Sequence, residues 1–364
     1  MKKKLIIFMP SIEGGGVEKN LFLVSNYLGK RIGNVSLITV SRKYKKKFHN
    51  SIEFISLMSN YWDKLGRRAK YFLSIFLLIR EILKNKNIIV FAFQANIYCI
   101  IVCKLFSIKV IARSNSAPAG WSRNKLKRLI FKFCLNLADK VMVNSIQFKK
   151  DLKKHFNVNA TCIYNPLNYD EILKKSKKKS KKIFTNKKQL KILNIGRFTE
   201  QKDQMTFLKA LNQIKGIIKF EAIIVGRGKL HKDLLEYIER NDLKNFVKII
   251  NFVENPFPLL KQTELFILSS KYEGLPNVLL EALALKKFII SSNCPTGPKE
   301  ILLNGKGGLL FNVSNHNQLS KKILYYIKNK KRCLKMLRYA IQNLYRFDYQ
   351  KNLNKYLNLV NQIS

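Results

Sequence analysis

Residues 271–285 read KYEGLPNVLLEALAL, a short polar turn that runs into an apolar pattern with helical spacing. Glu273 lies in a turn built from Gly274 and Pro276, and Glu281 lies about one helical turn inside the apolar segment. A proline at the head of a helix loses no hydrogen bond, and the N–H groups of the first turn form a ready anion site. Two carboxylates beside a helix N-terminus therefore suit a sugar nucleotide, which offers hydroxyl groups to the acids and a diphosphate to the helix.

A simpler interpretation makes both glutamates solvated charges on a helix surface, as most glutamates are. The neighbours of Glu281 argue against this interpretation, because the positions around it are Leu279, Leu280, Ala282 and Leu283. A segment with this composition is expected to be largely buried.

The length of 364 residues exceeds what one hydrophobic core usually holds, so two domains are expected. No apolar run reaches the roughly 20 residues that span a bilayer, and the run at 5–9 is too short for a signal peptide. The six cysteines form no Cys-x-x-Cys pair and are expected to be reduced thiols. We expect the chain to stay in the cytoplasm.

Lysine and arginine number 69 against 22 aspartates and glutamates, a formal net charge of +47 that attracts polyanions. A lysine-rich composition without functional meaning is one explanation. An anionic membrane surface is a second, and nucleic acid is a third. We find no recognisable nucleic-acid-binding module, and the first two explanations stay open.

Two segments of the first half combine aromatic, basic and aliphatic residues at helical spacing. The first covers residues 61–83 and opens with Tyr61-Trp62, and the second covers residues 121–133 and opens with Trp121. Such segments suit the surface of a bilayer. A helix that packs on a sheet shows the same apolar spacing, so both interpretations stay open.

Each half of the chain opens with an apolar strand, a glycine-containing turn and a helix. Alternation of strands with helical stretches continues through both halves, which predicts parallel α/β sheets. The predicted strands are 5–9, 35–40, 88–93, 109–112, 141–143, 190–195, 220–225, 247–252, 265–268 and 288–291.

The run Asn194-Ile-Gly-Arg-Phe-Thr-Glu-Gln-Lys202 follows one of these strands. Gly196 allows a sharp turn, and Arg197 and Lys202 then lie where α/β sheets bind ligands, beyond the carboxyl ends of the strands. Arginine offers a fork for phosphate oxygens and lysine a point charge.

Together these motifs resemble the retaining glycosyltransferases of family 4, which have the α/β GT-B fold of two facing Rossmann-like domains with an inter-domain cleft. The resemblance spans nearly the whole chain. It rests on Gly14–Glu18, Ala138–Val141, Gly196-Arg197 with Lys202, Val225–Gly228, Val253–Pro256, the pair Glu273 and Glu281, and Thr296–Ile301.

The resemblance implies a role for each matching residue. Arg197 and Lys202 would hold the donor diphosphate and stabilise its charge as the glycosidic bond breaks. Glu273, the third catalytic candidate, would accept hydrogen bonds from the donor sugar, and Glu281 from the ribose. The implied donor-binding residues are Gly15, Gly16, Gly226, Val253, Asn255, Gly274, Leu275, Pro276, Asn277, Val278 and Glu281.

The resemblance also implies the division of the chain into parts. We expect a Rossmann-like acceptor domain at 1–170, a basic linker at 171–189, a Rossmann-like nucleotide-sugar-binding domain at 190–346 and a helix at 347–364 that packs back on the first domain. The lysine-rich run at 174–188 has too little apolar surface to order itself, which predicts a loop.

One position departs from the family pattern. Family members often carry a histidine after the strand that ends here at Ile111-Ala112, where this sequence has Arg113-Ser114-Asn115. Arg113 and Asn115 are candidate contacts to the acceptor or the reacting sugar, and whether Arg113 replaces the histidine stays open. No Asp-x-Asp motif occurs, so we predict no metal and no cofactor beyond the nucleotide-sugar co-substrate.

The runs at 255–258 and 294–300 look most like bacterial enzymes that extend polysaccharides or lipid-linked oligosaccharides. We therefore expect a retaining hexosyltransferase of the EC 2.4 class that uses a UDP-linked hexose or N-acetylhexosamine. Its acceptor would be lipid-linked or a glycan in O-antigen, capsule or lipopolysaccharide synthesis. Its place would be peripheral, on the anionic inner face of the cell membrane, without nucleic acid.

Two alternatives remain. A UDP-N-acetylglucosamine 2-epimerase shares the GT-B architecture, but proton abstraction calls for acids and histidines, and this chain has only four histidines. A basic nucleic-acid-binding protein explains the charge and leaves Glu273 and Glu281 without a role.

Overall fold

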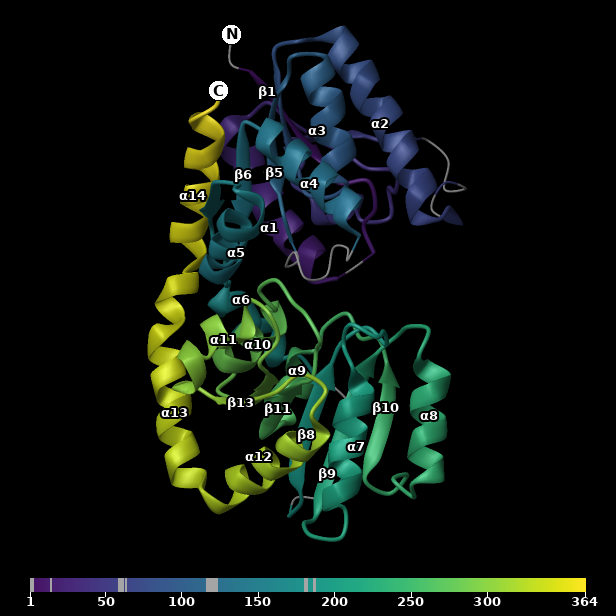
Figure 1. The fold of residues 1–364 in the computed structure, drawn as a ribbon, viewed down its shortest axis with the longest axis vertical. Helices are drawn as coiled ribbons and strands as arrows, with labels where there is room; N and C mark the ends of the chain where they lie inside the picture. Colours follow the sequence, from purple (N-terminus) through teal and green to yellow (C-terminus); the bar gives the residue numbers. More distant parts are fainter. Residues whose placement is uncertain are drawn as a thin grey trace. The chain divides into compact units, whose positions relative to one another are not determined.

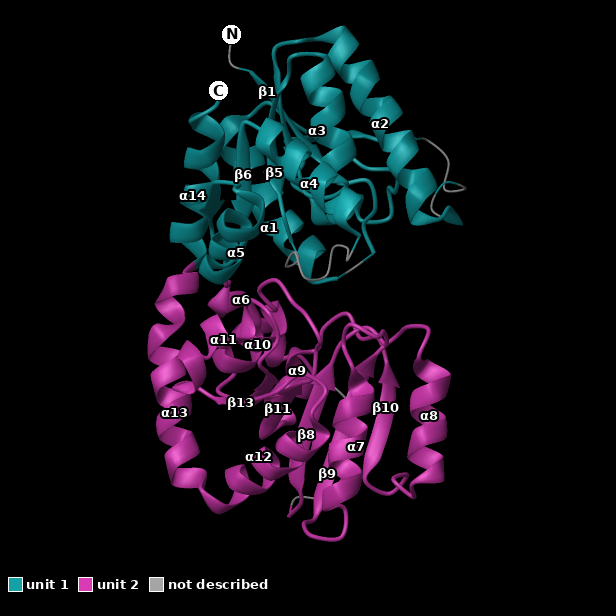
Figure 2. Cartoon of the chain, in the orientation of Figure 1, with its two compact units in different colours: residues 1–166, 349–364 teal, residues 167–348 magenta. Residues whose placement is uncertain are grey.

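The computed structural model describes residues 3–13, 15–57, 62, 64–115, 124–179, 183–185 and 188–364. The chain divides into two compact units (Figure 2). Unit 1 comprises Met1–Pro166 and Tyr349–Ser364, and unit 2 comprises Leu167–Asp348. Each unit is built around a parallel sheet, so the prediction of two parallel α/β halves is confirmed.

The described residues of unit 1 form a seven-stranded sheet in the order β3-β2-β1-β4-β5-β6-β7 (Figure 1). The strand order reverses between β1 and β4, which is where a doubly wound sheet opens a crevice for ligands. The strands are β1 (Lys4–Phe8), β2 (Val35–Ile38), β3 (Ile52–Ile55), β4 (Ile88–Ala92), β5 (Lys109–Arg113), β6 (Lys140–Val143) and β7 (Ala160–Cys162).

Helices cover both faces of this sheet. One face packs on α2 (Arg67–Lys84), α3 (Asn96–Leu105), α4 (Lys125–Leu137) and α5 (Ile146–Phe156). The other face packs on α1 (Gly16–Ile32) and on α14 (Tyr349–Asn361), which contributes the fully buried Leu353 and Tyr356. The segment predicted as a terminal amphipathic helix is therefore part of the core of unit 1.

Unit 2 contains a six-stranded sheet in the order β10-β9-β8-β11-β12-β13 within the described residues. Its strands are β8 (Leu190–Ile195), β9 (Phe220–Gly226), β10 (Val247–Asn251), β11 (Leu265–Leu268), β12 (Phe288–Ser292) and β13 (Leu309–Phe311). Its helices are α6 (Tyr169–Ser176), α7 (Gln204–Ile214), α8 (His231–Arg240), α9 (Phe257–Gln262), α10 (Asn277–Ala284), α11 (Pro298–Ile301), α12 (His316–Lys328) and α13 (Lys330–Gln342).

All ten predicted strands are present, and β3, β7 and β13 were missed. Each missed strand lies at the edge of its sheet, where it pairs on one side only. Edge strands need less apolar sequence than central ones; in β3, Glu53 is exposed between buried ends.

The prediction of a loop at 174–188 is wrong for its first residues, because α6 continues to Ser176. Asn168 caps this helix through the backbone N–H of Glu171, at 3.1 Å, and Ile172 is buried. The lysines occupy the last turn, where the helix dipole favours positive charge. Residues 180–182 and 186–187 of the predicted loop lie outside the described residues.

Among the helices that the structure describes, none combines the length and hydrophobicity needed to cross a bilayer.

Candidate functional site

The loops that follow β8 and β11 meet beyond the carboxyl edge of the unit 2 sheet. These two strands are neighbours at the point where the strand order reverses. Three hydrogen bonds join the strand ends and loops: Asn194 Nδ2 to the Ile267 carbonyl at 2.9 Å, Gln201 Nε2 to the Tyr272 carbonyl at 3.0 Å, and the Lys271 N–H to the Gln201 carbonyl at 2.8 Å. Open α/β sheets bind their ligands at such a switch point.

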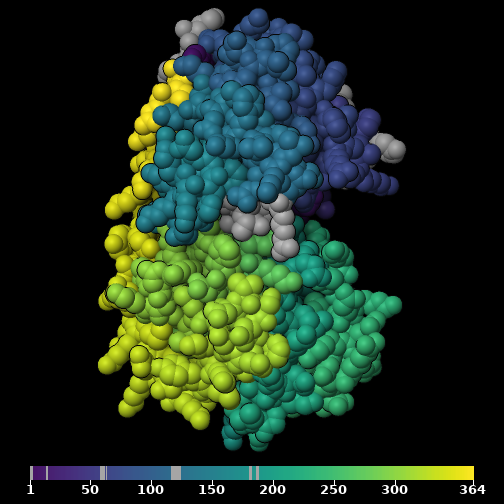
Figure 3. Space-filling view, in the orientation of Figure 1, coloured from purple at the N-terminus to yellow at the C-terminus, as the bar shows by residue number. Residues whose placement is uncertain are grey.

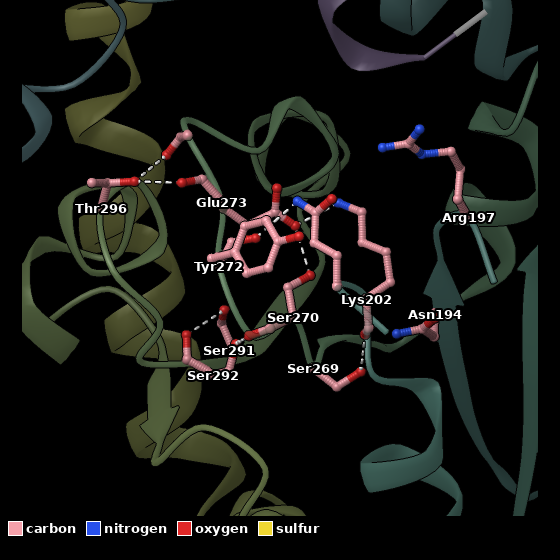
Figure 4. Close-up of polar contacts among 12 residues, drawn as sticks. Asn194, Arg197, Lys202, Ser269, Ser270, Tyr272, Glu273, Ser291, Ser292 and Thr296 are labelled. Atoms are coloured by element: carbon pink, nitrogen blue, oxygen red, sulfur yellow. Dashed lines mark hydrogen bonds and ion pairs between the residues drawn. The ribbon is translucent and has the colours of Figure 1, made fainter. Parts of the chain in front are cut away.

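Lys202 and Glu273 form an ion pair at this point, with Nζ 2.5 Å from Oε1 (Figure 4). The side chain of Lys202 is 17% exposed and that of Glu273 is 8% exposed. Ser270 Oγ donates to the same carboxylate oxygen at 2.6 Å. The structure therefore brings together two of the predicted catalytic residues, with opposite charges largely shielded from water.

Buried hydroxyl groups hold the backbone of both loops. Ser269 Oγ donates to the Lys202 carbonyl at 2.9 Å, and Ser292 Oγ donates to the Ser270 carbonyl at 2.6 Å. Thr296 Oγ1 lies 2.7 Å from the Glu273 carbonyl (Figure 4). Sequence reasoning missed these roles, because serines and threonines in loops show no diagnostic spacing.

Thr296 has a φ of 69°, in the left-handed region that is unusual for a β-branched residue. Its hydroxyl also lies 3.0 Å from the Gly274 carbonyl, so one side chain holds two consecutive backbone groups of the Glu273 loop. Backbone strain of this kind gathers at functional sites, where the surrounding contacts enforce it.

Cys294 lies close enough to Glu273 for the carboxylate to affect its thiol. Burial, and then the negative charge of Glu273, raise the pKa of Cys294 to about 12. The thiol therefore stays protonated at neutral pH and is no nucleophile.

Two glycines allow the loops to approach each other. A Cβ atom at Gly226 would overlap the carbonyl oxygen of Gly196, and a Cβ atom at Gly297 would overlap that of Gly274. This close packing accounts for glycine at position 226, which the family resemblance assigns to donor binding. The donor contact itself stays a prediction.

Arg197 is exposed and lies apart from the Lys202–Glu273 pair in Figure 4. Its backbone is fixed, because Gln204 Nε2 donates to the Arg197 carbonyl at 3.1 Å. The structure therefore places this predicted catalytic residue on the same loop as Lys202 and does not bring its guanidinium into the pair.

Helix α10 begins at Asn277, with Pro276 at its N-cap, as the sequence pattern predicts. Glu281 is 6% exposed, which confirms that it is not a solvated surface charge. The adjoining turn is buried at Gly274 and Leu275, and Val278 is half-buried. The ribose contact of Glu281 stays a prediction.

Asn255 makes structural contacts in the loop before α9. Its Nδ2 donates to the Lys175 carbonyl of α6 at 3.0 Å, and its Oδ1 accepts from the Phe257 N–H at 3.4 Å. Val253 is half-buried in the same loop. These contacts tie α6 to α9, and the donor role of both residues stays a prediction.

In unit 1 the carboxylate of Glu18 holds the glycine-rich loop. Its oxygens accept from the Glu13 N–H at 3.2 Å and the Gly15 N–H at 3.0 Å, while Gly16 begins α1. This capping arrangement was not foreseen, although a glutamate three residues after an N-cap is a known helix-start signal. Gly14 lies outside the described residues.

Arg113 is only 1% exposed, and its guanidinium lies 4.8 Å from the centre of the Phe93 ring. Nη2 donates to Asn165 Oδ1 at 3.1 Å, while Nε and Nη1 have no hydrogen-bond partner among the described residues. Burial lowers the pKa of Arg113. Asn115 Nδ2 donates to the Phe93 carbonyl at 2.8 Å. Contact with a sugar stays a prediction for Asn115, and the burial of Arg113 argues against such a contact for its guanidinium.

Within the ranges that the structure describes, no group of three or more histidine, cysteine, aspartate or glutamate side chains could hold a metal ion.

Two family models match the chain. The model "Glycosyltransferase Family 4" matches residues 14–171, and "Glycosyl transferases group 1" matches residues 175–343. The two models together cover most of the chain, which therefore is a glycosyltransferase with the GT-B fold whose first part matches family 4 and whose second part matches group 1.

The similar relatives include an uncharacterized glycosyltransferase of Methanocaldococcus jannaschii, which is 33% identical over 62% of this chain and 59% of its own length. A Campylobacter jejuni enzyme, N-acetylgalactosamine-N,N'-diacetylbacillosaminyl-diphospho-undecaprenol 4-alpha-N-acetylgalactosaminyltransferase, is 26% identical over 87% of this chain and 88% of its own length. The solved structure of Anabaena HepE with UDP and glucose shares the fold, with a TM-score of 0.78, 16% identity and 99% coverage of both chains.

Proposed function

We propose that this glycosyltransferase moves a hexose or N-acetylhexosamine from a UDP-sugar to a lipid-linked or polysaccharide acceptor, with retention of anomeric configuration, in cell-envelope glycan synthesis. It works at the inner face of the cell membrane. The Lys202–Glu273 pair at the switch point of unit 2 is the observation that carries the proposal. The Campylobacter relative, which acts on a diphospho-undecaprenol-linked sugar, supports the acceptor class.

In the proposed mechanism the donor exchanges places with the internal ion pair. Lys202 Nζ turns from Glu273 to the donor diphosphate, and the Glu273 carboxylate accepts hydrogen bonds from hydroxyls of the donor sugar. Lysine matches phosphate as a point charge, and a carboxylate is a strong acceptor for hydroxyls. Each group therefore keeps a charged or hydrogen-bonded partner when the donor enters.

Transfer breaks the bond between the anomeric carbon and the diphosphate oxygen, and it forms a bond from that carbon to the acceptor oxygen. Negative charge builds on the departing diphosphate oxygen as its bond to carbon breaks, and this oxygen takes the proton that the acceptor hydroxyl loses. Lys202 and Arg197 are fixed positive charges where that negative charge develops. We propose that they supply this stabilisation without a metal ion or other cofactor.

The test is a panel of nucleotide sugars incubated with the purified chain while UDP release and the anomeric configuration of the product are followed. We expect release from one or more UDP-hexoses or UDP-N-acetylhexosamines, with no release from GDP-mannose. The proton NMR spectrum of the product should show the same anomeric configuration as the donor sugar. Turnover should be unchanged when a metal chelator is added. Loss of turnover in chelator with recovery in manganese would contradict the metal-independent mechanism. Tight DNA binding without UDP affinity would contradict the transferase itself.

A further inference from the structure

The outer surface of α2, α3 and α4 concentrates exposed apolar side chains. The three helices lie side by side over one face of the unit 1 sheet (Figure 1), and Figure 3 shows the same face in space-filling form. The described residues include nineteen exposed large apolar or aromatic side chains, and eleven of them belong to these helices of 18, 10 and 13 residues. We call this surface the α2–α4 face; its exposed apolar residues are Phe72, Phe76, Leu83, Tyr98, Ile101, Leu105, Leu126, Leu129, Ile130, Phe133 and Leu137.

Helix α4 shows that this exposure exceeds what packing on a sheet requires. Its exposed apolar residues recur at spacings of three, one, three and four, which places all five on one side of a helix. A different side supplies the buried Cys134 and Leu135, which pack inward. The helix therefore has two apolar sides, and only one of them is used within the described protein. Packing on a sheet therefore explains the buried side of α4, and it gives no role to the exposed apolar side.

Positive charge surrounds the exposed apolar side chains. The three helices contain ten lysines and arginines and one acidic residue, Glu81. Glu81 is buried and already pairs with Lys84 at 2.9 Å and Arg80 at 3.4 Å. Four of the basic residues, Arg68, Lys125, Lys127 and Lys132, form no salt bridge within the described part of the chain.

We infer that the α2–α4 face is a docking surface for a bilayer that contains anionic lipids. Apolar side chains enter the boundary between headgroups and acyl chains, while lysines and arginines beside them contact lipid phosphates. Long basic side chains suit this position, because their aliphatic stems lie on apolar surface and their charged ends reach the headgroups. Trp121 and Arg123, which the sequence places just before α4, lie outside the described residues and form no part of this inference.

The charge on this face decides between a membrane and a second copy of the chain. Two copies that met through the face would bring together helices that hold ten basic residues against one buried acid in each copy, and like charges in contact are unfavourable. An anionic bilayer is complementary in charge and also accepts an irregular apolar surface. The inference adds to the proposed function the surface that brings the enzyme to a lipid-linked acceptor. Vesicle binding needs neither donor nor acceptor, so its failure and a failure of the proposed function are distinguishable.

The experiment is co-sedimentation of the full chain with vesicles of phosphatidylcholine plus phosphatidylglycerol, compared with phosphatidylcholine alone. We expect binding to the anionic vesicles, with a steep loss as salt is added. The double variant Leu129→Ser, Phe133→Ser should bind about tenfold more weakly because it loses apolar contact. Its matched control is Leu235→Ser, Leu334→Ser in unit 2, whose side chains are 44% and 48% exposed, and this variant should bind as the unaltered chain does.

A second variant pair separates local from overall charge. The triple change Lys125→Glu, Lys127→Glu, Lys132→Glu should weaken binding about tenfold. The control triple Lys321→Glu, Lys331→Glu, Lys335→Glu makes the same change in net charge on exposed helices of unit 2 and should bind nearly normally.

Equal loss in both triples would overturn the inference, because binding would then follow net charge alone. Unchanged binding of the Leu129, Phe133 variant would also overturn it. A third result would overturn it as well: light scattering finds dimers of the unaltered chain and none of the Leu129, Phe133 variant. The partner at this face would then be a second copy of the chain.

Hydrogen–deuterium exchange of the unaltered chain tests the same surface without any variant that could fail to fold. Anionic vesicles should slow exchange in residues 67–84, 96–105 and 125–137. Slower exchange only in other parts of the chain would refute the assignment.

Discussion

Lys202 and Glu273 are separated by 71 residues in the sequence, yet their charged atoms lie 2.5 Å apart. The pair joins the loops after β8 and β11, the two strands at which the unit 2 sheet reverses its order. In the proposed mechanism both charges change partner when a donor binds. Substitutions at the two positions should therefore affect nucleotide and sugar binding differently.

Lys202→Met should weaken UDP binding at least tenfold, or about 1.4 kcal/mol, because the diphosphate loses a charged contact. Isothermal titration with UDP measures the change. Lys271→Met is the matched control, since Lys271 lies next to the same loop and pairs with Glu200 at 3.4 Å. The control should bind UDP within about twofold of the unaltered chain. Unchanged affinity in Lys202→Met would remove this lysine from the diphosphate site.

Glu273→Gln should leave UDP affinity equal or higher, because Lys202 no longer has an anionic partner in the protein. Transfer should fall by about 10²–10³, the range seen when one polar contact to a transition state is removed. The measurement compares UDP titration with turnover on the active UDP-sugar. Parallel losses in both would contradict a contact between Glu273 and the sugar, and a lowered melting temperature would reveal a folding defect instead.

Gly226→Ala should destabilise the protein by about 1–3 kcal/mol, because the new methyl group would overlap the Gly196 carbonyl and displace the loop after β8. Gly216→Ala is the control, since nothing lies within 4 Å of its added Cβ. Its effect should stay within about 0.5 kcal/mol. Urea unfolding of both variants checks the difference, and equal stabilities would show that the two strands tolerate a wider separation.

Arg113→Met should fold at least as stably as the unaltered chain, because it removes a buried charge that has no carboxylate partner within the described residues. We expect transfer to stay within about threefold, since a side chain 1% exposed is held by Phe93 and Asn165. Thermal melting and steady-state kinetics test both statements. A large rise in KM for the acceptor with normal stability would instead support the sugar contact that the family pattern suggests.

Cys294 should resist alkylation in the folded protein. Its pKa is raised from 9.0 to about 12 by burial and by Glu273, so the thiolate fraction at pH 9 falls about 500-fold relative to an ordinary thiol. Peptide mapping after iodoacetamide treatment should find Cys162, which is half-buried, modified before Cys294. In urea the two should react alike. Rapid labelling of Cys294 in the native state would show that the loops around Glu273 open readily.

Much of the fold could be predicted from sequence because central parallel strands are buried on both faces and form apolar runs. The runs at β4 and β9, for example, are buried at every position. Strands β7 and β13 have three residues each and pair on one side, so their sequences contain too little periodic signal. The first three residues of the lysine-rich run are helical because Ile172 and the Asn168 cap, which precede them, stabilise α6 through contacts that composition does not show.

The site was partly predictable for a similar reason. Lys202 and Glu273 belong to motifs with fixed local spacing, but their contact is set by which strands are neighbours in the sheet, and sequence spacing cannot show that. Glu18 and Thr296 form hydrogen bonds with backbone groups of the loops, and sequence spacing does not show contacts of this kind. The burial of Arg113 depends on Phe93 and Asn165, which come from other segments of the chain.

Helix α14 completes the core of a unit whose other elements all precede residue 167. The chain supplies Leu353 and Tyr356 to unit 1 only after the whole of unit 2 has been made. On the ribosome, unit 2 therefore has all its residues first, while unit 1 still lacks the helix that covers part of one face of its sheet beside α1. Folding of the two units therefore cannot finish in the order in which they are begun, because a helix that emerges after unit 2 closes the core of unit 1.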